Sequence, residues 1–275
     1  MDIQPIKFTY KNSLVAFIDI LGFSDLVNKS RFDSQKRKIV EKIVNFVRDM
    51  IFDQEKILQP DDPFYLKVSF ISDSIVISTD APQSGNDSQL LNILKYTGSV
   101  GLSLLAIGVP CRGSIVTGKI FHLREPNFNT VVGPALVNAY NLEKTVAVYP
   151  RIVIDNSIYN LFKEYLATEY ALGDLETWKD LLKLDQDGEW FINIFHQIFV
   201  ANIQTLFLYG PEYEDDDILK QAGNSIIEGL KKSNPQTREQ DKYNWLLSQY
   251  LPYAPSDFKE LLVKYMCTRN GESSQ

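Results

Sequence analysis

The sequence is poor in the residues that many functional sites require. It has only two cysteines and two histidines in 275 residues, and neither pair is spaced as zinc ligands or redox partners are. Cys111 and Cys267 are therefore expected to be unlinked thiols, and His122 and His196 to have ordinary structural roles. The chain also lacks a G-x-S-x-G elbow and a G-x-x-x-x-G-K-[ST] phosphate loop. These absences argue against the common hydrolases and against a P-loop nucleotidase.

A basic excess and long apolar runs are missing as well. The net charge is -7, and binding to nucleic acid irrespective of sequence needs a basic surface, so we expect no nucleic-acid partner. Apolar stretches such as GLSLLAIGVP are too short to cross a bilayer, and the first residues do not have the pattern of a secretory leader. We therefore expect a cytoplasmic protein with no membrane partner.

The residues that are present predict an ordered series of strands and helices. LVAFIDI (14–20) is typical of a buried strand, helical periodicity follows to about residue 54, and FYLKVSF and IVIS predict a hairpin. A helix is expected over 89–105, a strand bent near Gly118 over 111–123, a helix from Gly133-Pro134 to about Lys144, and a strand over 151–155. This order predicts an α/β (α+β) fold with a ferredoxin-like or palm βαββαβ core. We expect residues 1–155 to form that core. Residues 156–275 are expected to continue it and to add a mainly helical C-terminal extension, with one possible strand at EWFINIF.

Two aspartates are predicted to meet at one edge of this sheet. In the βαββαβ topology the turn between the second and third strands lies beside the carboxyl end of the first strand. Asp19 is at that end and Asp73 is in that turn. Each alone has a simpler explanation, because aspartates often cap helices or occupy turns. Together they predict a site for two hard divalent cations, Mg²⁺ or Mn²⁺, completed by the Ile20 carbonyl. The amides of residues 21–24 can then receive phosphate oxygens.

Four motifs in the same order resemble those of the class III nucleotidyl cyclases. VAFIDILGFSD is similar to the first metal motif of that family and FISDSIVIS to the second. RGSIVTGKI resembles the strand whose arginine contacts the triphosphate, and GPALVNAYNLE resembles the helix that follows. The resemblance covers about residues 14–155. It implies that Asp19, Ile20 and Asp73 bind the metal ions and that Asp19, Asp73 and Arg112 are catalytic, with Arg112 on the substrate phosphates.

The departures from the family point to a different base. Ser69 and Thr130 stand where the family has the lysine and aspartate that read a purine, which disfavours ATP. The compact RG-x-I-x-x-G strand and the GPAL-x-x-AY-x-LE helix most resemble the bacterial pyrimidine cyclases of the Pycsar anti-phage systems. That resemblance implies a uridylate or cytidylate cyclase acting on UTP or CTP. Its cyclic UMP or cyclic CMP would activate a separate effector during infection.

The resemblance also implies how the nucleotide is held. Phe17, Phe23, Arg112 and Tyr140 are predicted to contact it, and Phe23 and Tyr140 are the candidates for stacking on the base. A homodimer with composite sites is implied, in which one subunit supplies the aspartates and the other supplies the helix of residues 133–143.

The transition-state residues of the family are missing. Val137 and Asn141 stand where the family has an asparagine and an arginine. Loss of such a cationic donor costs roughly 10²–10³ in rate, so another basic residue, Arg112 or Lys144, must replace it. The alternative is a degenerate cyclase domain that binds a nucleotide and regulates a partner without catalysis.

Overall fold

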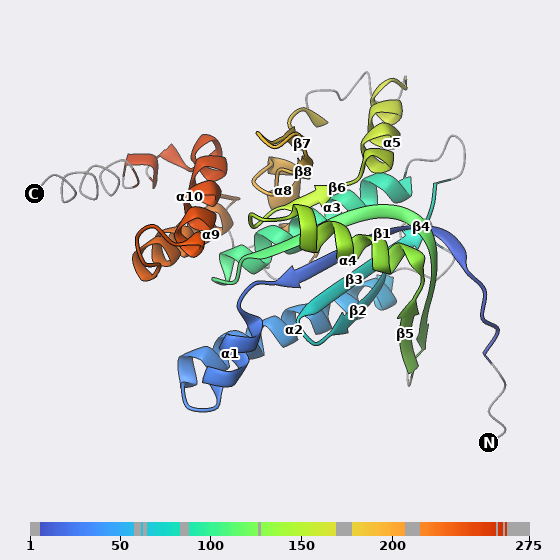
Figure 1. Ribbon diagram of the computed structural model, residues 1–275, viewed down its shortest axis with the longest axis horizontal. Coiled ribbons are helices and arrows are strands. Elements are labelled where there is room, and N and C mark those ends of the chain that lie inside the picture. Colours follow the sequence, from blue (N-terminus) through green and yellow to red (C-terminus); the bar gives the residue numbers. More distant parts are fainter. Residues whose placement is uncertain are drawn as a thin grey trace, which may run out of the picture.

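The structure of the chain is a computed structural model that describes residues 6–57, 62, 65–82, 88–125, 128–168, 178–206, 215–256, 258–260 and 262. Figure 1 shows its elements. The strands are β1 (Lys11–Ile20), β2 (Lys67–Ile71), β3 (Ser74–Asp80), β4 (Cys111–Glu125), β5 (Phe128–Val132), β6 (Ile152–Ile154), β7 (Leu182–Leu184) and β8 (Trp190–Ile192). The α-helices are α1 (Phe23–Ser30), α2 (Ser34–Ile57), α3 (Ser88–Ala106), α4 (Pro134–Val146), α5 (Asn156–Leu166), α8 (Gln197–Leu206), α9 (Asp215–Lys232) and α10 (Arg238–Tyr250).

The strands form one mixed sheet in the order β2-β3-β1-β4-β6-β8-β7, and β5 pairs with β4. β1 is antiparallel to β3 and to β4, and β2 is antiparallel to β3. β1 and β2 therefore run parallel with β3 between them, as in the predicted ferredoxin-like βαββαβ arrangement. β6 is parallel to β4, which makes the sheet mixed and the chain α/β. The predicted fold class is confirmed.

The two faces of the sheet bury different helices because side chains alternate along a strand. Ala16 and Ile18 of β1 belong to the main core with α2, α3, α8, α9 and α10. Val15 and Phe17 belong to a smaller cluster with the alanines of α4, and Figure 1 shows α4 across β1 and β4. The alternation places Asp19 on the α4 face. In the part of the chain that the structure describes, no helix is long and apolar enough to cross a bilayer.

Two glycines shape the segments around this face. Gly22 has φ 73° and turns the chain from β1 into α1, a left-handed conformation that glycine adopts without steric cost. At Gly133 a Cβ atom would lie 2.7 Å from the Lys119 carbonyl oxygen and 2.8 Å from the Ile120 Cα atom. Only glycine lets α4 begin so close to β4, and Pro134 follows at the first turn as predicted.

The region after residue 155 is helical apart from two short strands. β8 lies within the predicted EWFINIF segment and pairs with β6 and β7. β7 was not predicted, because three residues of which none is fully buried give no readable alternation. β7 and β8 widen the same sheet. Figure 1 shows α9 and α10 beyond the end of the sheet where β1 finishes and β4 begins.

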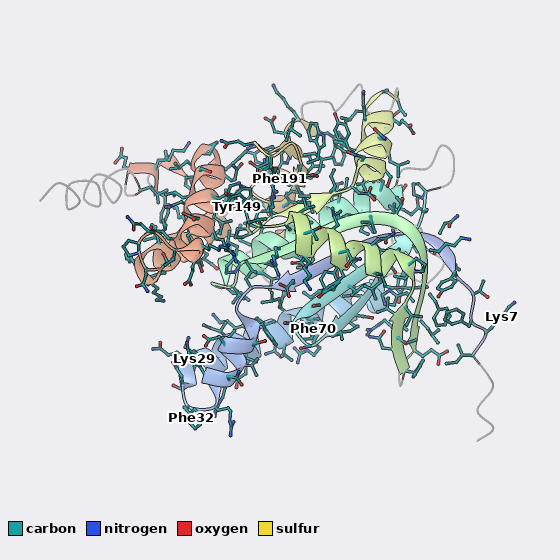
Figure 2. All side chains as sticks on the ribbon, in the orientation of Figure 1. Lys7, Lys29, Phe32, Phe70, Tyr149 and Phe191 are labelled. Carbon is teal, nitrogen blue, oxygen red and sulfur yellow. The ribbon has the colours of Figure 1, made fainter. Side chains whose placement is uncertain are left out.

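A buried arginine joins this region to the sheet. The side chain of Arg151 is 0% exposed and forms ion pairs with Asp185 and Asp187, which lie in the β7–β8 turn. Trp245 Nε1 of α10 donates to Asp185 Oδ2 at 3.0 Å, and its indole stacks on Tyr149 with ring centroids 5.5 Å apart. Phe191, which Figure 2 labels, also contacts Trp245, with ring centroids 5.4 Å apart. One charged cluster therefore fixes α10 against the sheet.

Candidate functional site

The two aspartates predicted as metal ligands lie at one edge of the sheet. Asp19 pairs in register with Ser74, the first residue of β3. Asp73 is in the two-residue turn before it, and the Ile20 N–H donates to the Asp73 carbonyl at 2.9 Å. Both aspartates are half-buried. The structure thus brings together two residues far apart in sequence, for the topological reason that predicted their meeting.

Arg112 lies directly beside Asp19, as its register partner on β4. Its Nε is 3.2 Å from Asp19 Oδ2 and also forms an ion pair with Glu143 of α4, whose side chain is 2% exposed. Arg112 is therefore held between two carboxylates. Glu143 was not predicted as a site residue, although it closes the GPALVNAYNLE motif. The sequence did indicate its burial, because Ala135, Ala139 and Glu143 follow one another at four-residue intervals and such residues share one face of a helix.

The electrostatics of this edge couple several ionisable groups. Burial raises the pKa of Glu143 to about 6, with the negative charge of Asp19 adding to the rise and Arg112 opposing it. Burial, reinforced by Asp19, raises the pKa of Cys111 to about 12. Cys111 is therefore a protonated, buried thiol with no nucleophilic role, and Cys267 lies outside the described residues.

Lys242 of α10 is a cation that the sequence did not indicate. Burial lowers the pKa of its ammonium group, and the next cause is the positive charge of Arg112, while Asp19 is among the charges that oppose the shift. Lys242 therefore lies within electrostatic reach of both residues. No local pattern in REQDKYNWLLSQY distinguishes this lysine, and only the docking of α10 places it here.

The aromatic residues predicted to contact the nucleotide divide between the two faces of the sheet. Phe17 and Tyr140 are together on the α4 face, with ring centroids 5.7 Å apart and planes at 90°. Tyr140 is 43% exposed, and the Lys144 ammonium lies 5.5 Å from its ring centroid. Phe23 instead packs against Phe70 on the other face, where Figure 2 labels Phe70. The structure brings Phe17 and Tyr140 together but not Phe23.

The donor set at this edge fits small, hard cations. Among the described residues, no group of three or more histidine, cysteine, aspartate or glutamate side chains could hold a metal ion. The predicted site is of another kind, with two carboxylates and the Ile20 carbonyl, all of them oxygen donors that Mg²⁺ and Mn²⁺ prefer. Arg112 supplies the positive charge beside Asp19 in this structure. Asp19 and Asp73 are thus the residues that can hold such ions.

Comparison with known proteins gives nucleotidyl cyclases among the solved structures. No family model and no curated protein matches the sequence. The adenylyl cyclase CyaB from P. aeruginosa is 15% identical, with a TM-score of 0.43 over 58% of this chain and 84% of that one. The guanylate cyclase domain of RhGC from Catenaria anguillulae, solved with GTP, is 16% identical, with a TM-score of 0.40 over 66% and 96%. A class III adenylyl cyclase-like ATP-binding protein from Pseudomonas aeruginosa is 12% identical, with a TM-score of 0.39 over 82% and 44%. Identities and TM-scores this low assign no function to the chain.

Proposed function

We propose that this chain is a nucleotidyl cyclase of the class III type that converts UTP or CTP to the 3′,5′-cyclic monophosphate and pyrophosphate. One observation carries the proposal. Asp19 and Asp73 meet at the edge of the sheet, where Ile20 N–H binds the Asp73 carbonyl and Arg112 lies beside Asp19. Paired carboxylates next to a cation are what a metal-dependent displacement at phosphorus requires.

The reaction is an intramolecular displacement at the α-phosphorus. The ribose 3′ oxygen forms a bond to phosphorus, the bond to the bridging oxygen of the β-phosphate breaks, and pyrophosphate leaves with the electron pair. The proton of the 3′ hydroxyl passes to solvent. Two Mg²⁺ or Mn²⁺ ions, when bound, lower the pKa of that hydroxyl and neutralise charge on the triphosphate. Asp19 and Asp73 hold those ions, and Arg112, no longer needed to neutralise Asp19, binds the phosphates.

We propose that Lys242 supplies the positive charge that is missing from the GPALVNAYNLE helix, where Asn141 replaces an arginine. Val137 is 57% exposed and uncharged, and Asn141, one turn later on α4, is also uncharged. Lys242 shares the electrostatic surroundings of Arg112 and Asp19. A second positive charge there stabilises the negative charge that develops on the leaving pyrophosphate. Helix α10 would then supply one of the side chains that bind the triphosphate.

The surface around α4 supports a homodimer with composite sites. Large apolar side chains are exposed on β5 and α4, which follow one another in the chain. They are Phe128 (45%), Val132 (42%), Val137 (57%) and Tyr140 (43%). A second copy seated on this surface would bury them, and apolar burial is the main favourable term in such association. The dimer would then place α4 of one copy over the aspartate edge of the other.

The choice of a pyrimidine and the biological role rest on the motif pattern. Ser69, 1% exposed, is small and neutral at the position where purine cyclases carry a lysine. We propose that the product is cyclic UMP or cyclic CMP, a messenger that activates a separate effector in defence against phage.

The decisive experiment is a product assay. The purified chain is incubated with each of the four nucleoside triphosphates and Mn²⁺, and cyclic products are identified by mass spectrometry. We expect product from UTP or CTP, and its loss in Asp19→Asn and Asp73→Asn. Asp80→Asn, at the opposite end of β3, is the matched control and should stay active.

The remaining outcomes separate the alternatives. Nucleotide binding with no product from any triphosphate would refute the cyclase and favour a regulatory domain, whereas ATP turnover would refute the pyrimidine assignment. Mixing Asp19→Asn with Tyr140→Ala chains should restore activity, because a hybrid dimer has one intact composite site. No recovery in hybrids that are shown to form would refute the composite arrangement.

A further inference from the structure

A buried histidine outside the aspartate edge is the centre of a hydrogen-bonded network. His122 is 6% exposed, with Nε2 2.7 Å from Ser69 Oγ and Nδ1 2.7 Å from Ser78 Oγ. Ser69 Oγ in turn donates to Asn129 Oδ1 at 2.7 Å. The four side chains come from β2, β3, β4 and β5, and the network ends at Asn129, which is exposed. We call it the Ser78–Asn129 network.

The directions of the hydrogen bonds follow from the amide oxygen of Asn129, which faces Ser69 Oγ, and from the number of protons in the network. The Ser69 hydroxyl has one proton, and it goes to Asn129 Oδ1, because an amide oxygen can only accept. Nε2 of His122 must therefore be protonated and donate to Ser69 Oγ. Burial, with two nearby cationic side chains, lowers the pKa of His122 to about 3, so the ring is neutral and carries one proton. Nδ1 is then unprotonated and accepts from the Ser78 hydroxyl.

The network engages only the oxygen of the Asn129 amide. Its oxygen is occupied by Ser69, so its Nδ2 group, with two N–H donors, points away from the network. Within the described ranges, no hydrogen bond engages Nδ2. Fully satisfied buried networks are rigid, and this one holds a hydrogen-bond donor in a single orientation at the protein surface.

The network lies on the face of the sheet that carries the candidate site. Phe17 pairs with Val76, and Val76 pairs with Ser69. Residues directly opposite one another on paired strands share a face, so Ser69 is on the same face as Phe17 and, two residues on, Asp19. β5, which carries Asn129, leads directly into α4 and its exposed apolar side chains. Along β5, Asn129 lies on the same face as Val131, which packs with the alanines of α4, whereas Phe128 and Val132 lie on the opposite face. The oriented amide is therefore on the α4 face, beside the helix whose Val137 and Tyr140 are exposed to a second copy.

We infer that Asn129 reads the base of the nucleotide and selects uracil over cytosine. This assignment rests on the proposed cyclase function, with the nucleotide held by Asp19 and Asp73 of one copy and its base facing Asn129 of the other. Nδ2 donates to the C4 carbonyl of uracil. Cytosine has an amino group at C4, so two donors would oppose each other and both would lose a partner. Ser69 and His122 are positioning residues that hold the amide.

The test compares kcat/KM for UTP and for CTP in wild type and in Asn129→Asp. In the variant one carboxylate oxygen still accepts from Ser69, while the other offers an acceptor that suits the cytosine amino group. We expect the UTP/CTP ratio to fall at least about tenfold, because a mismatched polar contact in a binding site is strongly rejected. Asn160→Asp, an exposed position on α5 with the same change of charge, should leave the ratio unchanged.

Several results would overturn the assignment. A wild type that prefers CTP, or an active Asn129→Asp variant with the original ratio, overturns base reading by Asn129 while the cyclase stands. No cyclic product from any triphosphate overturns the proposed function and this assignment with it.

A second measurement addresses the network without relying on activity. ¹⁵N NMR of the histidine-labelled chain should show His122 as the Nε2–H tautomer, with signals assigned by comparison with His196→Asn. The Nδ1–H tautomer would reverse every bond in the network. It would turn the Asn129 oxygen outward and overturn the selection of uracil.

Discussion

Removing the buried charge of Arg151 should destabilise the fold more than breaking any exposed ion pair of the described residues. Its side chain is 0% exposed and that of Asp185 is 11% exposed, so little water screens the pair. Arg151→Met fills a similar volume but leaves Asp185 buried without its cation. Breaking a buried pair in this way costs about 3–5 kcal/mol. The free energy of unfolding should fall by that amount.

A second substitution tests the reason for the loss. If the uncompensated carboxylate is the cause, Asp185→Asn in the Arg151→Met background should recover at least about 1 kcal/mol, because the amide that replaces the carboxylate carries no charge. The assay is urea denaturation followed by tryptophan fluorescence, since Trp245 bonds to Asp185. Lys231→Met is the matched control. Its pair with Glu228 is half-exposed on both sides and should contribute little to stability, because water screens exposed ion pairs.

The physical argument would be refuted by either of two results. One is a decrease in the free energy of unfolding for Arg151→Met that is no larger than the decrease for Lys231→Met. The other is a double variant as unstable as the single one, which would mean that lost packing rather than a buried charge is responsible.

Two further predictions concern the site. Folding raises the pKa of Glu143 from 4.5 to about 6, so the folded chain binds the proton of this carboxyl more tightly than the unfolded chain does. The free energy of unfolding should therefore fall by about 2 kcal/mol as the pH rises from below 4.5 to above 6. Glu143→Gln should therefore be more stable than wild type by up to that amount at pH 7.5, but not at pH 4. Urea denaturation measures the difference in free energy of unfolding between the two proteins, and an equal difference at both pH values would contradict the prediction. Lys242→Met should lower kcat/KM for the nucleotide by about tenfold or more if its ammonium meets the phosphates, as measured by cyclic product formation. Lys163→Met, exposed on α5, is the control, and equal activity of the two variants rules out the role of Lys242.

Local sequence patterns were enough to predict the edge of the sheet where Asp19 and Asp73 lie. LVAFIDI is apolar and β-branched, and the link between the next two strands is too short for anything but a hairpin. Once β1, β2 and β3 were assigned, the βαββαβ order brought Asp19 and Asp73 together. The placement of Arg112 as the neighbour of Asp19 follows from the same antiparallel register. The three-residue strand β7 had no such signal.

The sequence by itself therefore determined the arrangement of β1, β2 and β3 and the meeting of Asp19 with Asp73, because both follow from short-range patterns and one topology. Only the tertiary structure decided which charges surround them. Glu143 reaches Arg112 because α4 packs on β4, and the charge of Lys242 interacts with that of Arg112 because α10 packs against the sheet. The network at His122 likewise needs four strands in register. Such contacts join residues far apart in the chain, and their energies depend on burial, which no local pattern of residues records.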